Sequence, residues 1–195
     1  EAGGRFGSMR LAVLASGSGT ILDAMARSGL PISLVLVDRP CKAEKAAADH
    51  GLACELVERT SFGSDFDRVD YTLQVTERLQ AAEIELVVMA GFGTVLDQPI
   101  QDAYGGRILN THPSLLPAFP GWHAVQDAMD YGVKVTGCTV HVATLEVDAG
   151  PILAQQAVAV EPDDTVDTLH ERIKTVERDL YIRTVQEIID RGYVL

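Results

Sequence analysis

Short apolar runs recur along the chain and are separated by segments with helical spacing. Residues 11–15, 32–37 and 86–90 are almost entirely aliphatic; residues 107–110 follow a similar pattern, and a weaker run covers residues 53–56. A short, continuous apolar run between turn signals is typical of a strand buried on both faces of a sheet. We therefore predict five strands in the first 110 residues.

The segments between these runs predict helices. Residues 21–27 have apolar side chains at helical spacing, residues 41–50 are rich in Ala and Lys, and residues 65–82 form a long amphipathic stretch. A last helix is predicted over residues 166–191. Strands that alternate with helices of this length predict βαβ units, and therefore a mainly parallel sheet.

The pattern changes after Gly132. Residues 133–142 alternate between apolar and polar positions, and residues 151–160 form a second strand-like run. We expect a strand pair that is added to the sheet with partly antiparallel pairing. The predicted fold class is α/β: a Rossmann-like three-layer αβα arrangement, with a mainly parallel twisted sheet and an added antiparallel strand late in the chain.

Residues 9–195 contain no repeat, low-complexity segment or linker, so we expect a single domain. Residues 1–8 lack periodicity, and we interpret them as an expression-tag remnant or a disordered leader.

The net charge of −12 changes the range of partners to consider. Sequence-independent binding of nucleic acid depends on Lys and Arg, so we expect no nucleic-acid partner. No apolar stretch approaches the length of a membrane span, so we expect no membrane association. The three cysteines, Cys41, Cys54 and Cys138, lack metal-ligand spacing, as do the histidines. We therefore predict a cytoplasmic protein without a metal.

The segment S-G-S-G-T (residues 16–20) lies between the first strand and the first helix. Glycines let a backbone approach a ligand, and the free N–H groups of a helix start favour an anion. Ligands of open parallel sheets bind at the carboxyl ends of the strands, where this loop lies. A tight turn without a ligand is the alternative.

Asn110 and His112 stand two residues apart at the end of a predicted strand, so their side chains project to the same side. Pro113 and Pro117 restrict the backbone behind them. This pattern favours a functional pair, whereas a structural histidine beside a turn-capping asparagine is the alternative.

Two further groups are ambiguous from spacing alone. Asp148 lies in the loop between the two late strands, where a solvated acid is the usual explanation. Lys174 and Glu177 share one face of the last helix, where an exposed ion pair is the simpler interpretation.

Together these motifs resemble the folate-dependent formyltransferase family from Met9 to about Gly192. The strongest segments are I-L-N-T-H-P-S-L-L-P-A-F-P-G-W-H (residues 108–123) and T-V-H-V-A-T-L-E-V-D-A-G-P-I-L-A-Q (residues 139–155). An Asn-x-His-Pro-Ser-Leu-Leu-Pro segment followed by an Asp-x-Gly-Pro loop is not a pattern expected by chance.

The resemblance implies roles for individual residues. The implied catalytic trio is Asn110, His112 and Asp148. The residues implied for ribonucleotide binding are Gly17, Gly19, Thr20, Ile21, Pro113, Lys174 and Glu177. Those implied for folate binding are Thr94, Val95, Leu96, Val142, Ala143, Thr144 and Val147. Residues 9–105 would then be the phosphate-binding half, and residues 106–195 the catalytic and folate-binding half.

The implied reaction is transfer of a formyl group from 10-formyltetrahydrofolate to the amine of glycinamide ribonucleotide, in purine biosynthesis. The amine would attack directly, Asn110 and a protonated His112 would stabilise the oxyanion, and Asp148 would assist proton transfer. The expected partners are these two small molecules, and the chain would be a monomer or a homodimer.

The sequence departs from the family pattern at three places. Ile21 stands where the family commonly has Asn, Gly93-Thr94 stands where it usually has Met-Arg, and residues 65–68 lack a clean match to an Arg often found there. We expect these departures to affect ligand affinity, above all for folate, more than the catalytic trio.

Other functions remain open at this point. A related formyltransferase could act on another amine, such as that of a sugar nucleotide. Methionyl-tRNA formyltransferases and formyltetrahydrofolate deformylases generally carry an additional domain, for which the chain has no room. A catalytically silent protein that binds phosphorylated metabolites would also use the glycine-rich loop.

Overall fold

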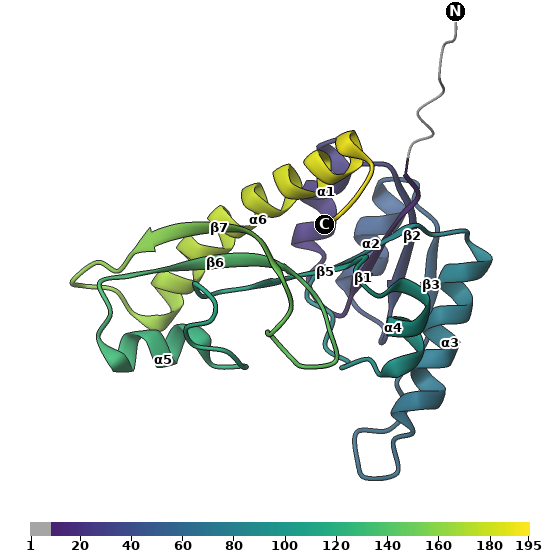
Figure 1. Ribbon diagram of the computed structural model, residues 1–195, viewed down its shortest axis with the longest axis horizontal. Coiled ribbons are helices and arrows are strands. Elements are labelled where there is room, and N and C mark those ends of the chain that lie inside the picture. The colour runs from purple at the N-terminus through teal and green to yellow at the C-terminus, as the bar shows by residue number, and fades with distance from the viewer. Residues whose placement is uncertain (1–8) are drawn as a thin grey trace, which may run out of the picture.

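The computed structural model describes residues 9–195, so our interpretation of residues 1–8 lies outside the described part. Seven strands form one sheet in the order β3-β2-β1-β4-β5-β6-β7 (Figure 1). The strands are β1 (Leu11–Ala15), β2 (Ile32–Val37), β3 (Cys54–Leu56), β4 (Leu86–Met89), β5 (Ile108–His112), β6 (Val135–Val142) and β7 (Ile152–Ala159). The helices are α1 (Thr20–Arg27), α2 (Lys42–Asp49), α3 (Arg68–Ala81), α4 (Gln98–Tyr104), α5 (Ala124–Tyr131) and α6 (Val166–Arg191).

The pairing of the strands confirms the predicted fold class. Strands β1 to β5 are mutually parallel, β6 is antiparallel to β5, and β7 is antiparallel to β6. The added antiparallel strand is therefore β6, and β7 continues the sheet beyond it.

Helices cover both faces of the sheet, as a three-layer arrangement requires. Within β1, Leu11, Val13 and Ala15 face a cluster shared with α1, α2 and α6, whereas Ala12 and Leu14 face a cluster shared with α3 and α4. All five side chains are fully buried. Burial on both faces explains why the run is continuously apolar instead of alternating.

Some element boundaries differ from the predicted ones. Helices α4 and α5 were not predicted because they are short, at seven and eight residues, and lie in turn-rich segments. Strand β5 ends at His112 instead of Asn110, because Asn110 and His112 pair with His141 and Thr139 of β6. Pairing with β6 thus extends β5 into a segment whose own sequence is typical of a turn.

Helix α6 is tied to the strands that lead into the polar motifs. The buried Tyr181 hydroxyl lies 2.8 Å from the carbonyl oxygen of Met89 and 3.0 Å from that of Leu109. Helix α6 therefore has a fixed position relative to the carboxyl ends of β4 and β5. No helix within residues 9–195 combines the length and apolar character needed to cross a membrane.

Candidate active site

A cleft of about 570 Å³ opens at the carboxyl ends of β1, β4 and β5. Most of its lining comes from the glycine-rich loop after β1, the loop after β4, the end of β5, the β6–β7 loop and one face of α6. Helix α4 and the turn after β5 add further residues. Of the residues predicted for the site, those that line the cleft are Gly17, Gly19, Thr20, Ile21, Thr94, Val95, Leu96, Asn110, His112, Pro113, Ala143, Thr144, Val147, Asp148, Lys174 and Glu177.

Val142 is the one predicted site residue that does not line the cleft. It is 1 % exposed, and its side chain belongs to the core cluster on the α6 side of the sheet. Its neighbour Ala143 faces the cleft instead, because successive side chains of a strand project to opposite faces.

The glycine-rich loop brings backbone N–H groups to one end of the cleft. Gly19 is the N-cap of α1 and has a φ of 74°, in the left-handed region. A Cβ atom there would lie 2.9 Å from the Cα of Ala43 in α2. Glycine is therefore required both by the turn and by the close approach of the two helices.

Helix α6 contributes a polar face to the same end of the cleft. Lys174 pairs with Glu171 at 2.7 Å and not with Glu177, which is 8 % exposed. Burial raises the pKa of Glu177, although a hydrogen bond with Thr111 opposes this shift. Burial and the nearby Lys174 lower the pKa of His170. The simple exposed ion pair considered from the sequence is thus not formed.

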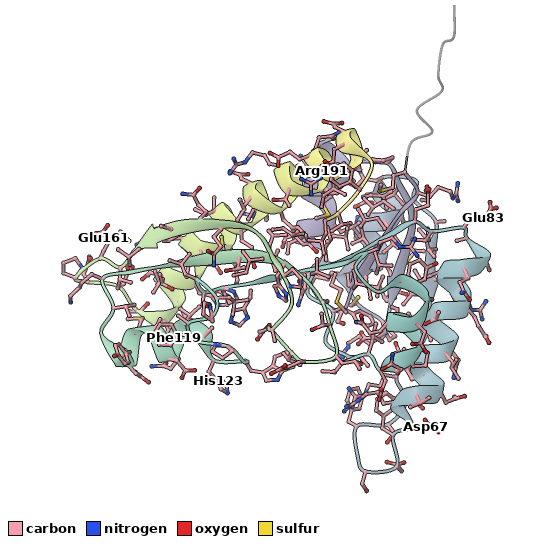
Figure 2. The ribbon with its side chains drawn as sticks, in the orientation of Figure 1. Asp67, Glu83, Phe119, His123, Glu161 and Arg191 are labelled. Carbon is pink, nitrogen blue, oxygen red and sulfur yellow. The ribbon has the colours of Figure 1, made fainter. Side chains whose placement is uncertain are left out.

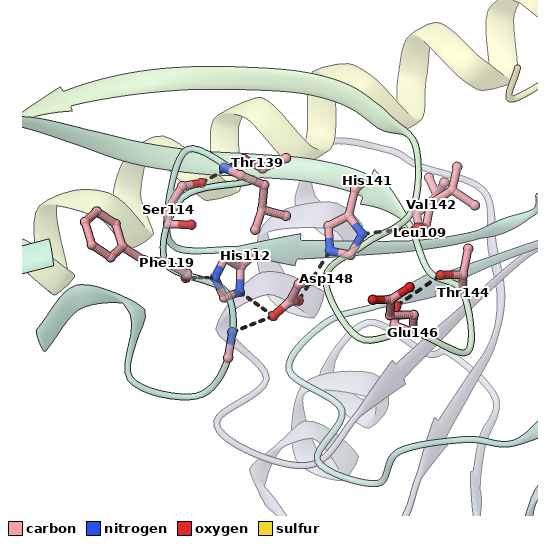
Figure 3. A network of polar contacts seen from close by, with 12 residues as sticks. Leu109, His112, Ser114, Phe119, Thr139, His141, Val142, Thr144, Glu146 and Asp148 are labelled. Atoms are coloured by element: carbon pink, nitrogen blue, oxygen red, sulfur yellow. Dashed lines mark hydrogen bonds and ion pairs between the residues drawn. The ribbon is translucent and has the colours of Figure 1, made fainter. Parts of the chain in front are cut away.

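The catalytic candidates lie together on the other face of β5 and β6. Asn110 is half-buried and His112 is 5 % exposed. Directly opposite residues of paired strands share a face, so His141 lies beside Asn110, and Thr139 beside His112. Asp148 reaches this face from the β6–β7 loop (Figure 3).

Both nitrogen atoms of the His112 ring face an acceptor. Nε2 lies 2.8 Å from the carbonyl oxygen of Phe119, and Nδ1 lies 3.4 Å from Oδ2 of Asp148 (Figure 3). A carbonyl oxygen only accepts, so Nε2 carries a proton. Nδ1 is therefore the ring atom at which a proton can be exchanged.

The carboxylate of Asp148 is fixed by its own loop and by the neighbouring segment. Its side chain is 6 % exposed, and Oδ2 accepts a 2.8 Å hydrogen bond from the N–H of Gly121. At the base of the loop, a Cβ atom on Gly150 would lie 1.7 Å from the carbonyl oxygen of Val142. Only glycine fits there, so the loop returns tightly against β6 and holds Asp148 over His112.

His141 is a member of the site that the sequence did not reveal. Its Nδ1 bonds the carbonyl of Val142 at 3.1 Å, and its buried Nε2 lies 3.8 Å from Oδ1 of Asp148 without a hydrogen-bond partner among residues 9–195. Burial lowers the pKa of His141. Its place in the site follows from the pairing of β6 with β5 opposite Asn110.

The proline-containing turn after β5 is bound to β6 by Thr139. The Thr139 hydroxyl donates to the carbonyl of Ser114 at 2.7 Å and accepts from the N–H of Leu116 and from Gln155. The turn then leads to Phe119, which lies between β5 and α5 in Figure 2. The prolines therefore act together with a specific hydrogen-bond network to hold the turn.

The loop after β4 also lines the cleft and is bonded at Gly91 and Gly93 to Ser16, where the glycine-rich loop begins. Thr94 is 1 % exposed, and its hydroxyl donates to Asp38 at 2.7 Å, so its side chain turns into the protein. Further lining residues that were not predicted include Phe92, Gln101, Trp122 and Arg178. Among residues 9–195, no three His, Cys, Asp or Glu side chains are grouped so as to hold a metal ion.

The chain matches known proteins over nearly its whole length. A family model described as "Formyl transferase" matches residues 9–185. A phosphoribosylglycinamide formyltransferase of Mycobacterium tuberculosis strain H37Rv is 44 % identical over 188 residues, covering 94 % of this chain and 86 % of that protein.

Solved structures agree with this relationship. Glycinamide ribonucleotide transformylase 1 from Symbiobacterium toebii has a TM-score of 0.87 and 38 % identity, and covers 94 % of this chain and 89 % of that one. A phosphoribosylglycinamide formyltransferase from Bacillus halodurans has a TM-score of 0.86 and 36 % identity, with coverage of 95 % and 98 %. The chain therefore belongs to the formyl transferase family and is a purine-biosynthetic formyltransferase of the phosphoribosylglycinamide type.

Proposed function

We propose that the chain transfers the formyl group of 10-formyltetrahydrofolate to the amine of glycinamide ribonucleotide. The observation that carries this proposal is the contact between His112 and Asp148 beside Asn110, inside one cleft. An amide, an imidazole and a carboxylate in this arrangement supply an oxyanion donor and a route for protons.

Different parts of the cleft lining suit different ligands. The glycine-rich loop and the α6 face, with Lys174 and Arg178, offer backbone N–H groups and positive charge to a phosphate. Glu177, nearly buried beside them, would accept hydrogen bonds from ribose hydroxyls. The loop after β4 and the β6–β7 loop offer mainly backbone and apolar groups, such as Leu96 and Val147, to the flat folate ring.

The proposed reaction proceeds by direct attack of the substrate amine on the formyl carbon. The carbonyl oxygen becomes an oxyanion, to which the side-chain amide of Asn110 donates; one such donor typically contributes about 3 kcal/mol. As the carbon–nitrogen bond to folate breaks, the folate nitrogen takes up a proton and the attacking amine loses one. The amine itself is the nucleophile, so no covalent enzyme intermediate is required.

The ring of His112 directs these proton movements through Nδ1. Nε2–H is bound to the carbonyl of Phe119, so the proton that a protonated ring can give up is the one on Nδ1, which faces Asp148. That proton passes to the folate nitrogen, and Asp148 accepts the proton that the amine loses, directly or through a bound water. Transfer of this proton from Asp148 to Nδ1 then restores the charged pair. This assigns oxyanion stabilisation mainly to Asn110, and proton transfer to the His112–Asp148 pair.

A turnover assay with purified protein tests the proposal. Deformylation of 10-formyl-5,8-dideazafolate is followed with glycinamide ribonucleotide, with an amino-sugar nucleotide and with no amine, and the fold is verified by circular dichroism. We expect turnover with the ribonucleotide alone. Turnover only with the sugar nucleotide, or none from a folded protein that binds the ribonucleotide, would contradict the proposed substrate.

A further inference from the structure

Asp38 is a fully buried carboxylate directly after β2, outside the lining of the cleft. Arg39 donates to it twice, from Nε to Oδ1 at 2.9 Å and from Nη2 to Oδ2 at 3.0 Å. Thr94 donates its hydroxyl proton to Oδ2 at 2.7 Å. Burial by itself would raise the pKa of Asp38, but hydrogen bonds from Arg39, Thr94 and Ser16 outweigh it, so the pKa is lowered and the carboxylate is charged.

These contacts join three segments that are distant in the sequence. Ser16 follows β1, Asp38 follows β2, and the loop after β4 contains Gly93 and Thr94. The N–H of Gly93 donates to the Ser16 hydroxyl at 2.7 Å, and the N–H of Ser16 donates to the carbonyl of Gly91 at 3.1 Å. The loop is thus held at Gly91, Gly93 and Thr94, and its residues 91–96 all line the cleft.

Gly93 lacks a side chain at the point where the Arg39 guanidinium packs against the loop. A Cβ atom at this position would lie 3.1 Å from Nη2 of Arg39 and 3.6 Å from Oγ of Ser16. The guanidinium that binds Asp38 therefore occupies the space into which a side chain at position 93 would project. Asp38, Arg39, Gly93 and Thr94 fit together as one unit, which we call the Asp38 lock.

We propose that Asp38 is a positioning residue for the formyl donor, because the Asp38 lock sets the backbone of residues 91–96 against which the donor binds. This inference rests on the proposed function for the identity of the donor. The Thr94 hydroxyl points away from the cleft, so its effect on the donor is indirect. The glycine-rich loop and the α6 face would bind the ribonucleotide. The Thr94 hydroxyl bonds Asp38 and not these segments, so loss of that bond should leave the ribonucleotide affinity largely unchanged.

The most selective test is Thr94→Val, which keeps the shape of the side chain and removes only the bond to Asp38. We expect the KM for the formyl donor to rise about tenfold, as loss of one hydrogen bond to a charged group would give. The KM for the ribonucleotide and kcat should stay within about twofold, and Thr94→Ser should restore the donor KM. Thr76→Val, which removes a buried hydroxyl from α3, is the matched control.

Two measurements do not depend on turnover. The Kd of a non-reactive folate analogue, measured by calorimetry, should rise in parallel with the donor KM. Hydrogen exchange should become faster in residues 91–96 of Thr94→Val and stay unchanged in Thr76→Val. Gly93→Ala, which places a methyl group against the Arg39 guanidinium, should change both measurements in the same direction and to a smaller extent.

The possible results separate the two proposals. An unchanged donor KM and analogue Kd in Thr94→Val, or equal increases for both substrates, would overturn the positioning role. Analogue binding that weakens in Thr94→Val while the wild type shows no formyl transfer would support the lock and contradict the proposed function. A folded wild type that binds no folate analogue overturns the inference.

Discussion

Three groups face the carboxylate of Asp148 from different directions. The N–H of Gly121 and Nδ1 of His112 both face Oδ2, while Nε2 of His141 faces Oδ1. A neutral His141 would present a lone pair to this oxygen, because its Nδ1 proton is bound to the carbonyl of Val142. The two carboxylate oxygens of Asp148 therefore face different partners: the N–H of Gly121 at Oδ2 and, with a neutral His141, a lone pair at Oδ1.

Replacing Asp148 by Asn keeps the shape of the side chain but removes its charge and its basicity. We expect kcat to fall about 10²–10⁴-fold, the usual contribution of a group that transfers protons. The Kd of the ribonucleotide should change little, because the glycine-rich loop and α6 are untouched. Steady-state kinetics and calorimetry test this, with the exposed Asp163→Asn as the control. Retention of full activity would remove Asp148 from the mechanism.

The buried Glu177 makes the stability of the protein dependent on pH. Its folded pKa is raised, chiefly by burial, so the folded state holds the proton more tightly than the unfolded chain does. The stability that Glu177 contributes is therefore present below its ordinary value of 4.5 and is lost as the pH rises through the folded pKa.

The variant Glu177→Gln should abolish this loss. We expect its free energy of unfolding to exceed that of the wild type at about pH 8 and to approach it at about pH 3.5, as measured by urea denaturation. The KM for the ribonucleotide should rise in the same variant. Glu187→Gln, an exposed change on the same helix, should show no such dependence on pH; a Glu177→Gln variant that behaves like this control would contradict the argument.

The sequence predicted which polar residues line the cleft better than it predicted the directions of their side chains. Asn110 and His112 could be placed on one side because they lie two apart in a strand. The inward position of His141 depends on the register of β6 with β5, which no local pattern encodes. The Thr94 side chain points toward Asp38 because of a hydrogen bond between residues that lie 56 positions apart in the chain.

Among the elements, α6 has the largest influence on the site. It supplies His170, Lys174, Glu177 and Arg178 to the cleft. Through Tyr181, it also binds the backbone of β4 and β5 just before the two loops that carry polar groups. One helix thus supplies polar side chains to the cleft and is itself bonded to the strands that lead into it.

Tyr181→Phe removes the hydroxyl and retains the buried ring. We expect the free energy of unfolding to fall by about 1–3 kcal/mol, because buried carbonyl groups lose a donor. Urea denaturation measures this change. Tyr193→Phe, on a 59 % exposed tyrosine, should be neutral. An equal effect of the two substitutions would show that the Tyr181 hydroxyl does not tie α6 to the sheet.

Long periodic elements were predictable, whereas short ones were not. Helix α6 has 26 residues and was predicted with its observed ends. Helix α4 begins beside Pro99 and ends at Gly105, and α5 ends at Gly132, so few helical positions remain to show a period. These short helices pack against α3 and α6, respectively, which lie in other segments of the chain.

At the scale of the whole molecule, one core joins both halves of the chain. The cluster on the α6 side contains Leu11 and Val35 from residues 9–105, and Val140, Ile173 and Tyr181 from residues 106–195. Parallel pairing could be predicted from the alternation of strands and helices. The order of the strands could not, because it depends on which apolar faces pack best together.

The shared core leads us to expect that residues 9–195 unfold as a single cooperative unit. Differential scanning calorimetry should give a ratio of calorimetric to van't Hoff enthalpy close to one, as for a two-state domain. A ratio near two, or two separate transitions, would indicate that the halves fold independently. If the chain unfolds as one unit, a substitution that stabilises the core of either half should raise one common Tm.

The close approach of Gly150 to Val142 also bears on how the protein could be redesigned. The base of the β6–β7 loop tolerates no side chain at Gly150, while Leu145 and Val147 near its tip are 48 % and 55 % exposed. A library that varies these two positions and retains Gly150 and Asp148 would explore new donor preferences without moving the carboxylate. Gly150 must therefore be kept, whereas the exposed tip of the loop can be varied. Selection experiments should begin with Leu145 and Val147.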